Sequence, residues 1–282
     1  MLSDYKYNKN AVPIAYDKNN IFYYNEIKDK NKDSIKSINI LPIFNINNLI
    51  PCIVYISAPS RSGKTYLTIQ LLKQFLIKKR KIFIIGNTPE DYEDVKSKII
   101  SVNDFVGLNN ETNNLNEKLI KFKHRKKHFD DEQKEQIEIE LNRLKNIKKE
   151  KNNYIIKNWE KLKNSVVVFD DWEHDSADNI EKSWFLINNI CTRGRHNNTG
   201  AIIITHLTTH FLHSRTLLNE ANYIILFNKT LFKYLNYLCS IYLGFENINI
   251  KKIVKLLEYN RWVSIDRNNL HYLITPDEIT II

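Results

Sequence analysis

The stretch at residues 54–66, VYISAPSRSGKTY, restricts the fold of this chain more than any other part of the sequence. Residues 52–56 form a short apolar run of the kind found in buried β-strands, and Ala58-Pro59 ends it. Gly63-Lys64-Thr65 then opens a run in which apolar residues recur at helical spacing. A strand, a glycine-containing loop and a helix in this order predict a phosphate-binding P-loop, the Walker A motif. The alternative is a chance Gly-Lys-Thr at the start of an ordinary helix.

Each part of this loop has a function in binding a nucleoside triphosphate. Successive backbone N–H groups and the amino end of a helix form a cradle for phosphate. Lys64 reaches the β- and γ-phosphates, and Thr65 offers a hydroxyl to Mg²⁺. We therefore expect ATP and Mg²⁺ as ligands. The predicted nucleotide-binding residues are Ala58, Pro59, Ser60, Arg61, Ser62, Gly63, Lys64, Thr65 and Tyr66.

One residue of the loop departs from the motif, which has glycine at its first position where this chain has Ala58. A methyl group is tolerated there if the backbone does not need a positive φ angle. Gly63 is retained at the tightest point of the loop. The departure is therefore compatible with phosphate binding.

A second motif follows the apolar residues of the run 165–169, which delivers Asp170 and Asp171 at the end of a predicted strand. We expect Asp170 on a strand adjacent to the P-loop strand, where it holds Mg²⁺ through water as a Walker B acid. Asp171 is then placed to polarise the attacking water as a general base. Paired acids indicate a motor that hydrolyses ATP, and the alternative is an exposed Asp-Asp loop after a core strand.

A further buried strand is expected at residues 201–204, and it presents Thr205 and His206 at the same edge of the sheet. A polar residue there senses the γ-phosphate in hydrolytic motors, while the alternative is simple hydrogen bonding at a strand end. Arg193 and Arg195 precede this strand on a predicted turn. An arginine offered to the γ-phosphate of an adjacent subunit would neutralise charge in the transition state. We expect Arg195 in this role, although either arginine is also compatible with a surface cation.

Apolar strands without polar alternation predict an α/β fold whose mainly parallel sheet is covered on both faces. Further strands are expected at 82–85, 223–227 and 262–265, and C-terminal helices at 231–242 and 250–257. We divide the chain into an N-terminal lead-in, residues 1–45, with short strands near 21–24 and 38–41, and a P-loop ATPase domain, residues 46–282.

Within that domain, residues 109–164 are rich in Lys and Glu and contain no Gly or Pro. Apolar residues at 137, 141, 144 and 147 recur at helical spacing, which predicts a helical insertion. Such an insertion is either a basic arm that contacts DNA or a neighbouring subunit, or a solvated helix that has no further function.

The composition favours a polyanionic partner, because the formal net charge is +10 and the sequence pI is about 9.2. No apolar run approaches the roughly 20 residues that span a membrane, and the N-terminus has no signal-peptide core. We therefore expect a protein that is made and used inside a cell. The three cysteines have neither metal-ligand spacing nor the pattern of a disulfide framework. His206, His210 and His213 would align on a helix as zinc ligands, but no carboxylate or cysteine completes the set.

Three motifs in this order resemble the genome-packaging ATPases of large DNA viruses and virophages, a branch of the FtsK–HerA superfamily. The first is A-x₄-G-K-T at residues 58–65, and the second is VVVFDD at 166–171. The third is TRGRH at 192–196, ahead of the strand that ends in His206. The resemblance covers about residues 45–230.

The resemblance implies a RecA-like αβα sandwich of the class that carries an additional catalytic acid. It implies a homo-oligomeric ring, a hexamer or pentamer, that drives double-stranded DNA into a preformed capsid. Capsid or portal components would be its partners, and the host cytoplasm, the viral factory or the virion its location, with no membrane. A weaker similarity to the family extends over residues 259–266. The family's strand usually ends in Gln where this chain has His206, and this difference and Ala58 are its departures from the pattern.

Two other functions share the P-loop. A nucleoside or nucleotide kinase would need an arginine-rich lid and an acceptor site, neither of which can be located in the sequence. A degenerate P-loop protein would bind nucleotide in a structural or regulatory role, with Ala58 and His206 as signs of decay.

Overall fold

The computed structural model describes the elements of the chain and most of their connections. The described residues are 2–3, 12–18, 20–24, 34–37, 40–42, 52–77, 79–86, 89–95, 97–108, 120–121, 139, 154–206, 214–267 and 272–281. Of the predicted insertion, residues 109–153 therefore lie outside the described residues except for 120–121 and 139. The part at 154–164 contains a short strand, β10 (Tyr154–Ile156), and a 3₁₀-helix, η4 (Trp159–Leu162), and no α-helix.

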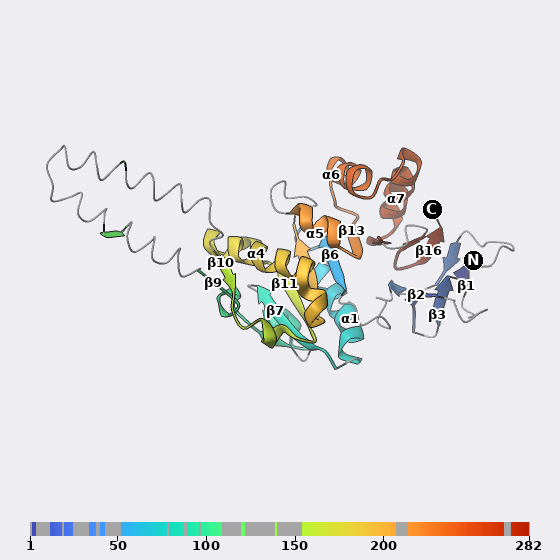
Figure 1. Ribbon diagram of the computed structural model, residues 1–282. Coiled ribbons are helices and arrows are strands. Elements are labelled where there is room, and N and C mark those ends of the chain that lie inside the picture. Colours follow the sequence, from blue (N-terminus) through green and yellow to red (C-terminus); the bar gives the residue numbers. More distant parts are fainter. Residues whose placement is uncertain are drawn as a thin grey trace.

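A ten-stranded sheet forms the centre of the fold (Figure 1). Neighbouring strands are parallel from β13 to β8 and antiparallel from β4 to β13. In spatial order the strands are β4 (Ser34–Lys36), β16 (Glu278–Ile281), β15 (Tyr272–Ile274), β14 (Trp262–Asp266), β13 (Tyr223–Phe227), β6 (Ile53–Ser57), β12 (Gly200–Thr205), β11 (Ser165–Asp170), β7 (Lys81–Gly86) and β8 (Lys98–Ile99).

The central strands are buried along their whole length because both faces of the sheet are covered. Every residue of β6, β11, β12 and β13 is buried. Side chains alternate between two cores, so that Val167 and Ile203 join one cluster while Val166 and Ile202 join the other. This two-sided burial explains the continuous Val and Ile runs of the sequence.

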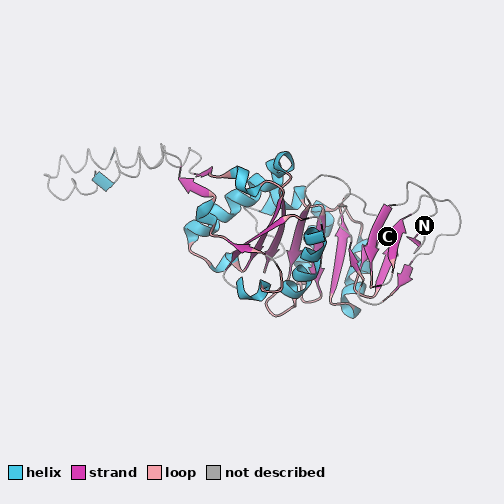
Figure 2. Ribbon diagram, turned by 90° about the horizontal axis from the view of Figure 1, so that it is seen from below, coloured by secondary structure: helices cyan, strands magenta, loops and turns pink. Residues whose placement is uncertain are grey.

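Helices cover the two faces of the sheet, as Figure 2 shows. On one face α1 (Lys64–Ile77) packs Leu67, Leu71 and Leu72 into the core. The helices that contribute to the opposite core are α4 (Ala177–Arg193), α5 (Ser214–Glu220), α6 (Phe232–Tyr237), the π-helix η7 (Leu238–Tyr242) and α7 (Asn247–Tyr259). The predicted α/β sandwich with a mainly parallel sheet is confirmed.

The remaining elements are short. A four-stranded N-terminal sheet has the order β1 (Leu2–Ser3), β3 (Ile21–Tyr24), β2 (Val12–Tyr16) and β5 (Leu41–Pro42). The N-terminal segment also contributes β4, which pairs with β16 in the main sheet. Strand β9 (Val106–Leu108) pairs with β10. The other described 3₁₀-helices are η1 (Pro89–Tyr92), η2 (Val102–Asp104), η5 (Trp172–His174) and η6 (Gly194–Asn197).

The predicted elements of the P-loop domain are present, with small shifts in their bounds. The helix predicted at 231–242 is divided into α6 and the π-helix η7. Helix α4 and strands β15 and β16 were not predicted. In the part of the chain that the structure describes, no helix is both long and apolar enough to span a membrane.

Candidate active site

The predicted site residues lie where three parallel strands end. The P-loop follows β6. Thr205 is the last residue of β12 and is followed by His206, and Asp170 is the last residue of β11 and is followed by Asp171. Strand β12 pairs with both β6 and β11 and therefore lies between them. The prediction that Asp170 is on a strand adjacent to the P-loop strand is thus wrong. The intervening strand has a chemical consequence, because it brings His206 between the loop and the acids.

Two residues of the loop have left-handed backbone conformations. Arg61 and Gly63 have positive φ angles of 59° and 90°, and Gly63 is followed directly by the first residue of α1. Ala58 is not among the described residues with positive φ, and its N–H donates to the Thr205 carbonyl at 3.0 Å. Its methyl group is completely buried in the core beneath α1. Alanine therefore fits this position without strain.

Lys64 is buried and lies between His206 and an acid. Its Nζ is 3.0 Å from His206 Nε2 and 3.4 Å from Asp171 Oδ1. His206 Nε2 is itself 3.0 Å from Asp171 Oδ1, and Ser60 Oγ is 3.4 Å from His206 Nδ1. Three predicted catalytic side chains, one at the start of α1 and one directly after each of β11 and β12, therefore form one hydrogen-bonded cluster.

Asp171 is held in its ionised form by this cluster. Burial acts to raise the pKa of its carboxyl, but the hydrogen bond with His206 and the positive charge of Lys64 together lower that pKa below its usual range. Its backbone has a φ angle of 51°, the left-handed conformation, directly after the last residue of β11. An ionised carboxylate at this position is able to accept a proton.

Asp170 is more deeply buried and has different partners. Thr65 Oγ1 donates to its Oδ2 at 3.1 Å, and the Tyr92 hydroxyl donates to the same oxygen at 2.7 Å. Its other oxygen, Oδ1, is buried and has no hydrogen-bond partner among the described residues. Burial raises the pKa of Asp170, because the charge lies in a poorly solvated position. An orphaned carboxylate oxygen beside a threonine hydroxyl fits a hard cation such as Mg²⁺.

The residues after the acid pair hold the end of β12 in place, and sequence reasoning missed this function. Glu173 Oε2 accepts the backbone N–H of His206 at 2.8 Å, and Trp172 Nε1 donates to the Ile204 carbonyl at 3.1 Å. The Tyr55 hydroxyl and Thr205 Oγ1 are 2.8 Å apart, which anchors the same strand end to β6. Thr205 therefore satisfies the strand end, whereas His206 reaches the cluster.

A group of possible metal ligands overlaps this cluster. One ligand atom each from Asp171, His174 and His206 lies within 4.8 Å of the others. Asp171 and His206 also contact the Lys64 ammonium group, whose charge opposes a second cation. The group therefore supports no metal assignment. Of the predicted histidine set, His210 and His213 lie outside the described residues.

Arg261 contacts the P-loop from a distant part of the sequence. Its Nε donates to the Ser62 carbonyl at 2.6 Å, and a Cβ at Gly63 would collide with its guanidinium group. In a planar trans peptide the C=O and the N–H point in opposite directions. Holding the Ser62 carbonyl on one side therefore directs the Gly63 N–H to the other. The weak family similarity at residues 259–266 was the only feature of the sequence that pointed to a role for this residue.

The two candidate arginines lie away from the cluster. Arg193 is the last residue of α4, and Arg195 is in η6, ahead of the first residue of β12. The site lies at the other end of β12, and a strand of this length spans about 20 Å. Both side chains are exposed, and neither contacts the cluster within the described part of this chain. Tyr66 is also exposed, on the first turn of α1.

Comparisons with known proteins give distant likenesses. No family model matches the chain. The uncharacterized protein V3 of the Sputnik virophage is 28% identical over 109 residues, which is 38% of this chain and 44% of that protein. The chain thus spans less than half the length of this curated relative.

Among solved structures, the genome packaging NTPase B204 of Sulfolobus turreted icosahedral virus 2, in complex with ATP-gammaS, is 16% identical. The alignment covers 81% of this chain and 97% of B204, with a TM-score of 0.42. VirB4 of Thermoanaerobacter pseudethanolicus is 12% identical over 82% of this chain and 88% of its own, with a TM-score of 0.45. Because the TM-scores are low, the assignment of the fold rests on the strand order described above.

Proposed function

We propose that this protein is an ATPase that translocates double-stranded DNA and packages a viral genome into a capsid. The observation that supports this proposal best is the cluster of Lys64, Asp171 and His206 beside the Thr65–Asp170 pair. It combines a phosphate-binding loop with an ionised acid that a binding protein would not need. The basic net charge and the motif resemblance are consistent with a DNA substrate.

In this proposal the loop backbone from Ala58 to Gly63 binds the phosphates, with Lys64 and Thr65 at the start of α1. Thr65 and Asp170 would hold Mg²⁺, which supplies positive charge to the phosphate oxygens when it is bound. The carboxylate of Asp171 orients the attacking water and accepts its proton as the bond to the γ-phosphate forms. Tyr66, exposed beside the loop, lies on the nucleotide side of α1 in this proposal.

His206 is the proposed sensor of the γ-phosphate, because it contacts both Lys64 and Asp171 and directly follows the last residue of β12. A displacement of Lys64 toward phosphate would change the hydrogen bonds of His206. Glu173 accepts the backbone N–H of His206, so a movement of His206 would also move η5 and the segments on both sides of it.

An arginine from a neighbouring subunit completes the proposed site. Arg195, with Arg193 as the alternative, is exposed at the opposite edge of the sheet, from which it is free to face another protomer. This arrangement requires a homo-oligomeric ring, a hexamer or a pentamer. A capsid or portal component is the further partner, in the host cytoplasm, the viral factory or the virion.

The test is ATP hydrolysis measured with and without duplex DNA under conditions in which the protein assembles. We expect DNA to stimulate hydrolysis, Lys64→Ala to abolish it, and Asp171→Asn to bind ATP without turnover. Asp277→Asn, which removes an exposed carboxylate from the turn before β16, is the matched control and should remain active. An ATPase rate that DNA does not change would contradict the translocase. Nucleotide binding without hydrolysis in every oligomeric and DNA-bound form would indicate a degenerate P-loop.

A further inference from the structure

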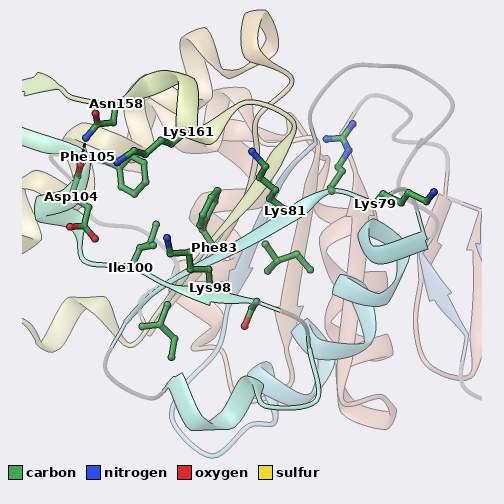
Figure 3. A pocket seen from close by; sticks show the side chains of 13 residues that line it. Lys79, Lys81, Phe83, Lys98, Ile100, Asp104, Phe105, Asn158 and Lys161 are labelled. Atoms are coloured by element: carbon green, nitrogen blue, oxygen red, sulfur yellow. Dashed lines mark hydrogen bonds between the residues drawn. The ribbon is translucent and has the colours of Figure 1, made fainter.

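A basic pocket of about 940 Å³ lies at the edge of the sheet beside β7 and β8 (Figure 3). Its walls come from the α1–β7 turn, from the segment that contains β8 and η2, and from the 3₁₀-helix η4. The apolar residues of the lining include Phe83, Ile100 and Phe105, with the two rings 6.1 Å apart. Figure 3 shows Lys98 and Lys161 beside these rings, while Lys79 points away from them.

The charge of this pocket is strongly unbalanced. Its cationic residues are Lys79, Arg80, Lys81, Lys98 and Lys161, and its single acid is Asp104. Within the described residues, none of the five cations forms an ion pair. Like charges on three separate segments repel one another unless an anion lies between them. The pocket is therefore complementary to a polyanion.

Arg80 differs from the lysines of the lining because part of its guanidinium is buried and bonded within the protein. Its Nη2 donates to Asn198 Oδ1 at 2.9 Å, but its Nη1 is buried and has no hydrogen-bond partner among the described residues. Burial also lowers the pKa of the Arg80 guanidinium. Arg80 therefore contributes charge to the lining, while the exposed lysines are the groups that a phosphate can contact.

The pocket is distinct from the candidate active site. Lys81 is the first residue of β7 and pairs with Ser165, the first residue of β11. The acids Asp170 and Asp171 lie at the other end of β11. The two sites are therefore at opposite ends of the parallel strands. A substitution in the pocket leaves the P-loop cluster intact.

We propose that this pocket binds the phosphate backbone of DNA. Duplex DNA carries a phosphate charge about every 1.7 Å along its axis, which suits several cations spread over three segments. An acidic peptide is less well matched, because the edge strand β8 is only two residues long and offers little backbone pairing. The proposal rests on the proposed function in that this DNA would be the substrate of the motor.

The experiment measures the binding of a short fluorescein-labelled DNA duplex by anisotropy over a range of NaCl concentrations. The test variant is Lys98→Gln with Lys161→Gln. The matched control is Lys251→Gln with Lys255→Gln, which removes the same charge from two exposed positions on α7. We expect the slope of log K against log salt to become shallower by about 2 in the test variant, because each lost phosphate contact contributes about 0.9. The control should keep the wild-type slope, and equal slopes in all three proteins would overturn the proposal.

Two further results separate this inference from the proposed function. If DNA stimulates hydrolysis in the wild type and the test variant with the same half-saturating DNA concentration, the pocket is not the DNA site and the motor stands. If the test variant loses binding of a poly-glutamate peptide but keeps the duplex, the pocket serves an acidic protein partner and the proposal is wrong. Hydrolysis without DNA should be equal in all three proteins if the pocket acts only on DNA.

Discussion

Replacing Arg261 with alanine tests whether the P-loop is held in its binding shape by a residue 199 positions away. The substitution removes the hydrogen bond from the guanidinium to the Ser62 carbonyl, which fixes the Ser62–Gly63 peptide. A hydrogen bond with one charged partner contributes about 1.5–3 kcal/mol. Because Arg261 is exposed, screening by water favours the lower end, about 1.5 kcal/mol. That free energy corresponds to a roughly tenfold weaker affinity for ATP.

The measurements on the Arg261→Ala protein are the equilibrium dissociation constant for ATP, kcat and the thermal midpoint. We expect the Kd to rise about tenfold and kcat at saturating ATP to stay nearly unchanged, because the lost contact affects ground state and transition state alike. Arg261→Lys should recover part of the affinity, since it keeps a charged donor without the guanidinium fork. Arg267→Ala is the control, because Arg267 donates to the carbonyls of Leu218 and Asn219 beyond the other end of β14. An unchanged Kd in Arg261→Ala, or an equal rise in Arg267→Ala, would refute the reasoning.

Three other experiments have expected outcomes. Asp170→Asn should raise the thermal midpoint above that of the wild type at neutral pH without Mg²⁺. The folded protein raises the pKa of Asp170 above 3.8, its ordinary value, so ionisation of this carboxyl costs stability as the pH rises from 3.8 to the raised pKa and beyond. The gain should vanish when unfolding is measured below about pH 4, and a gain that persists there would have another cause. Tyr92→Phe removes the hydroxyl that donates to Asp170. In a titration of ATP hydrolysis with Mg²⁺, the half-saturating Mg²⁺ concentration should rise about tenfold, and a curve equal to that of the wild type would argue against a role of Tyr92 in Mg²⁺ binding. Mixing Arg195→Ala with Lys64→Ala protein should restore part of the ATPase activity, since some sites would combine an intact loop with an intact arginine; no recovery in mixed rings would exclude Arg195 as the residue acting between subunits.

Local patterns predicted the P-loop and the strand that carries the acids, because strand, loop and helix follow one another directly in the chain. The order of the strands is not local, so the sequence did not show that β12 lies between β6 and β11. The contacts of His206 with Lys64 and Asp171 depend on that order. The same is true of Arg261 and Tyr92, which reach the site from the turn before β14 and from η1.

Helix α4 is a different case, because its sequence did carry a signal. Ser176 caps its amino end by accepting the Asn179 N–H, and Ile180, Trp184 and Ile187 recur at helical spacing. Its Asn residues and its β-branched Ile and Thr residues have low helix propensity, which weakens the pattern. Packing against β12 and η2 stabilises the helix.

The most direct test of the proposed motor is displacement of a third DNA strand from a duplex by the assembled protein. We expect the wild type to remove the third strand in the presence of ATP and Mg²⁺. Asp171→Asn protein should bind both ATP and the duplex but leave the third strand in place. If the wild type consumes ATP in the presence of this DNA and the third strand stays bound, the protein is an ATPase that does not translocate along DNA.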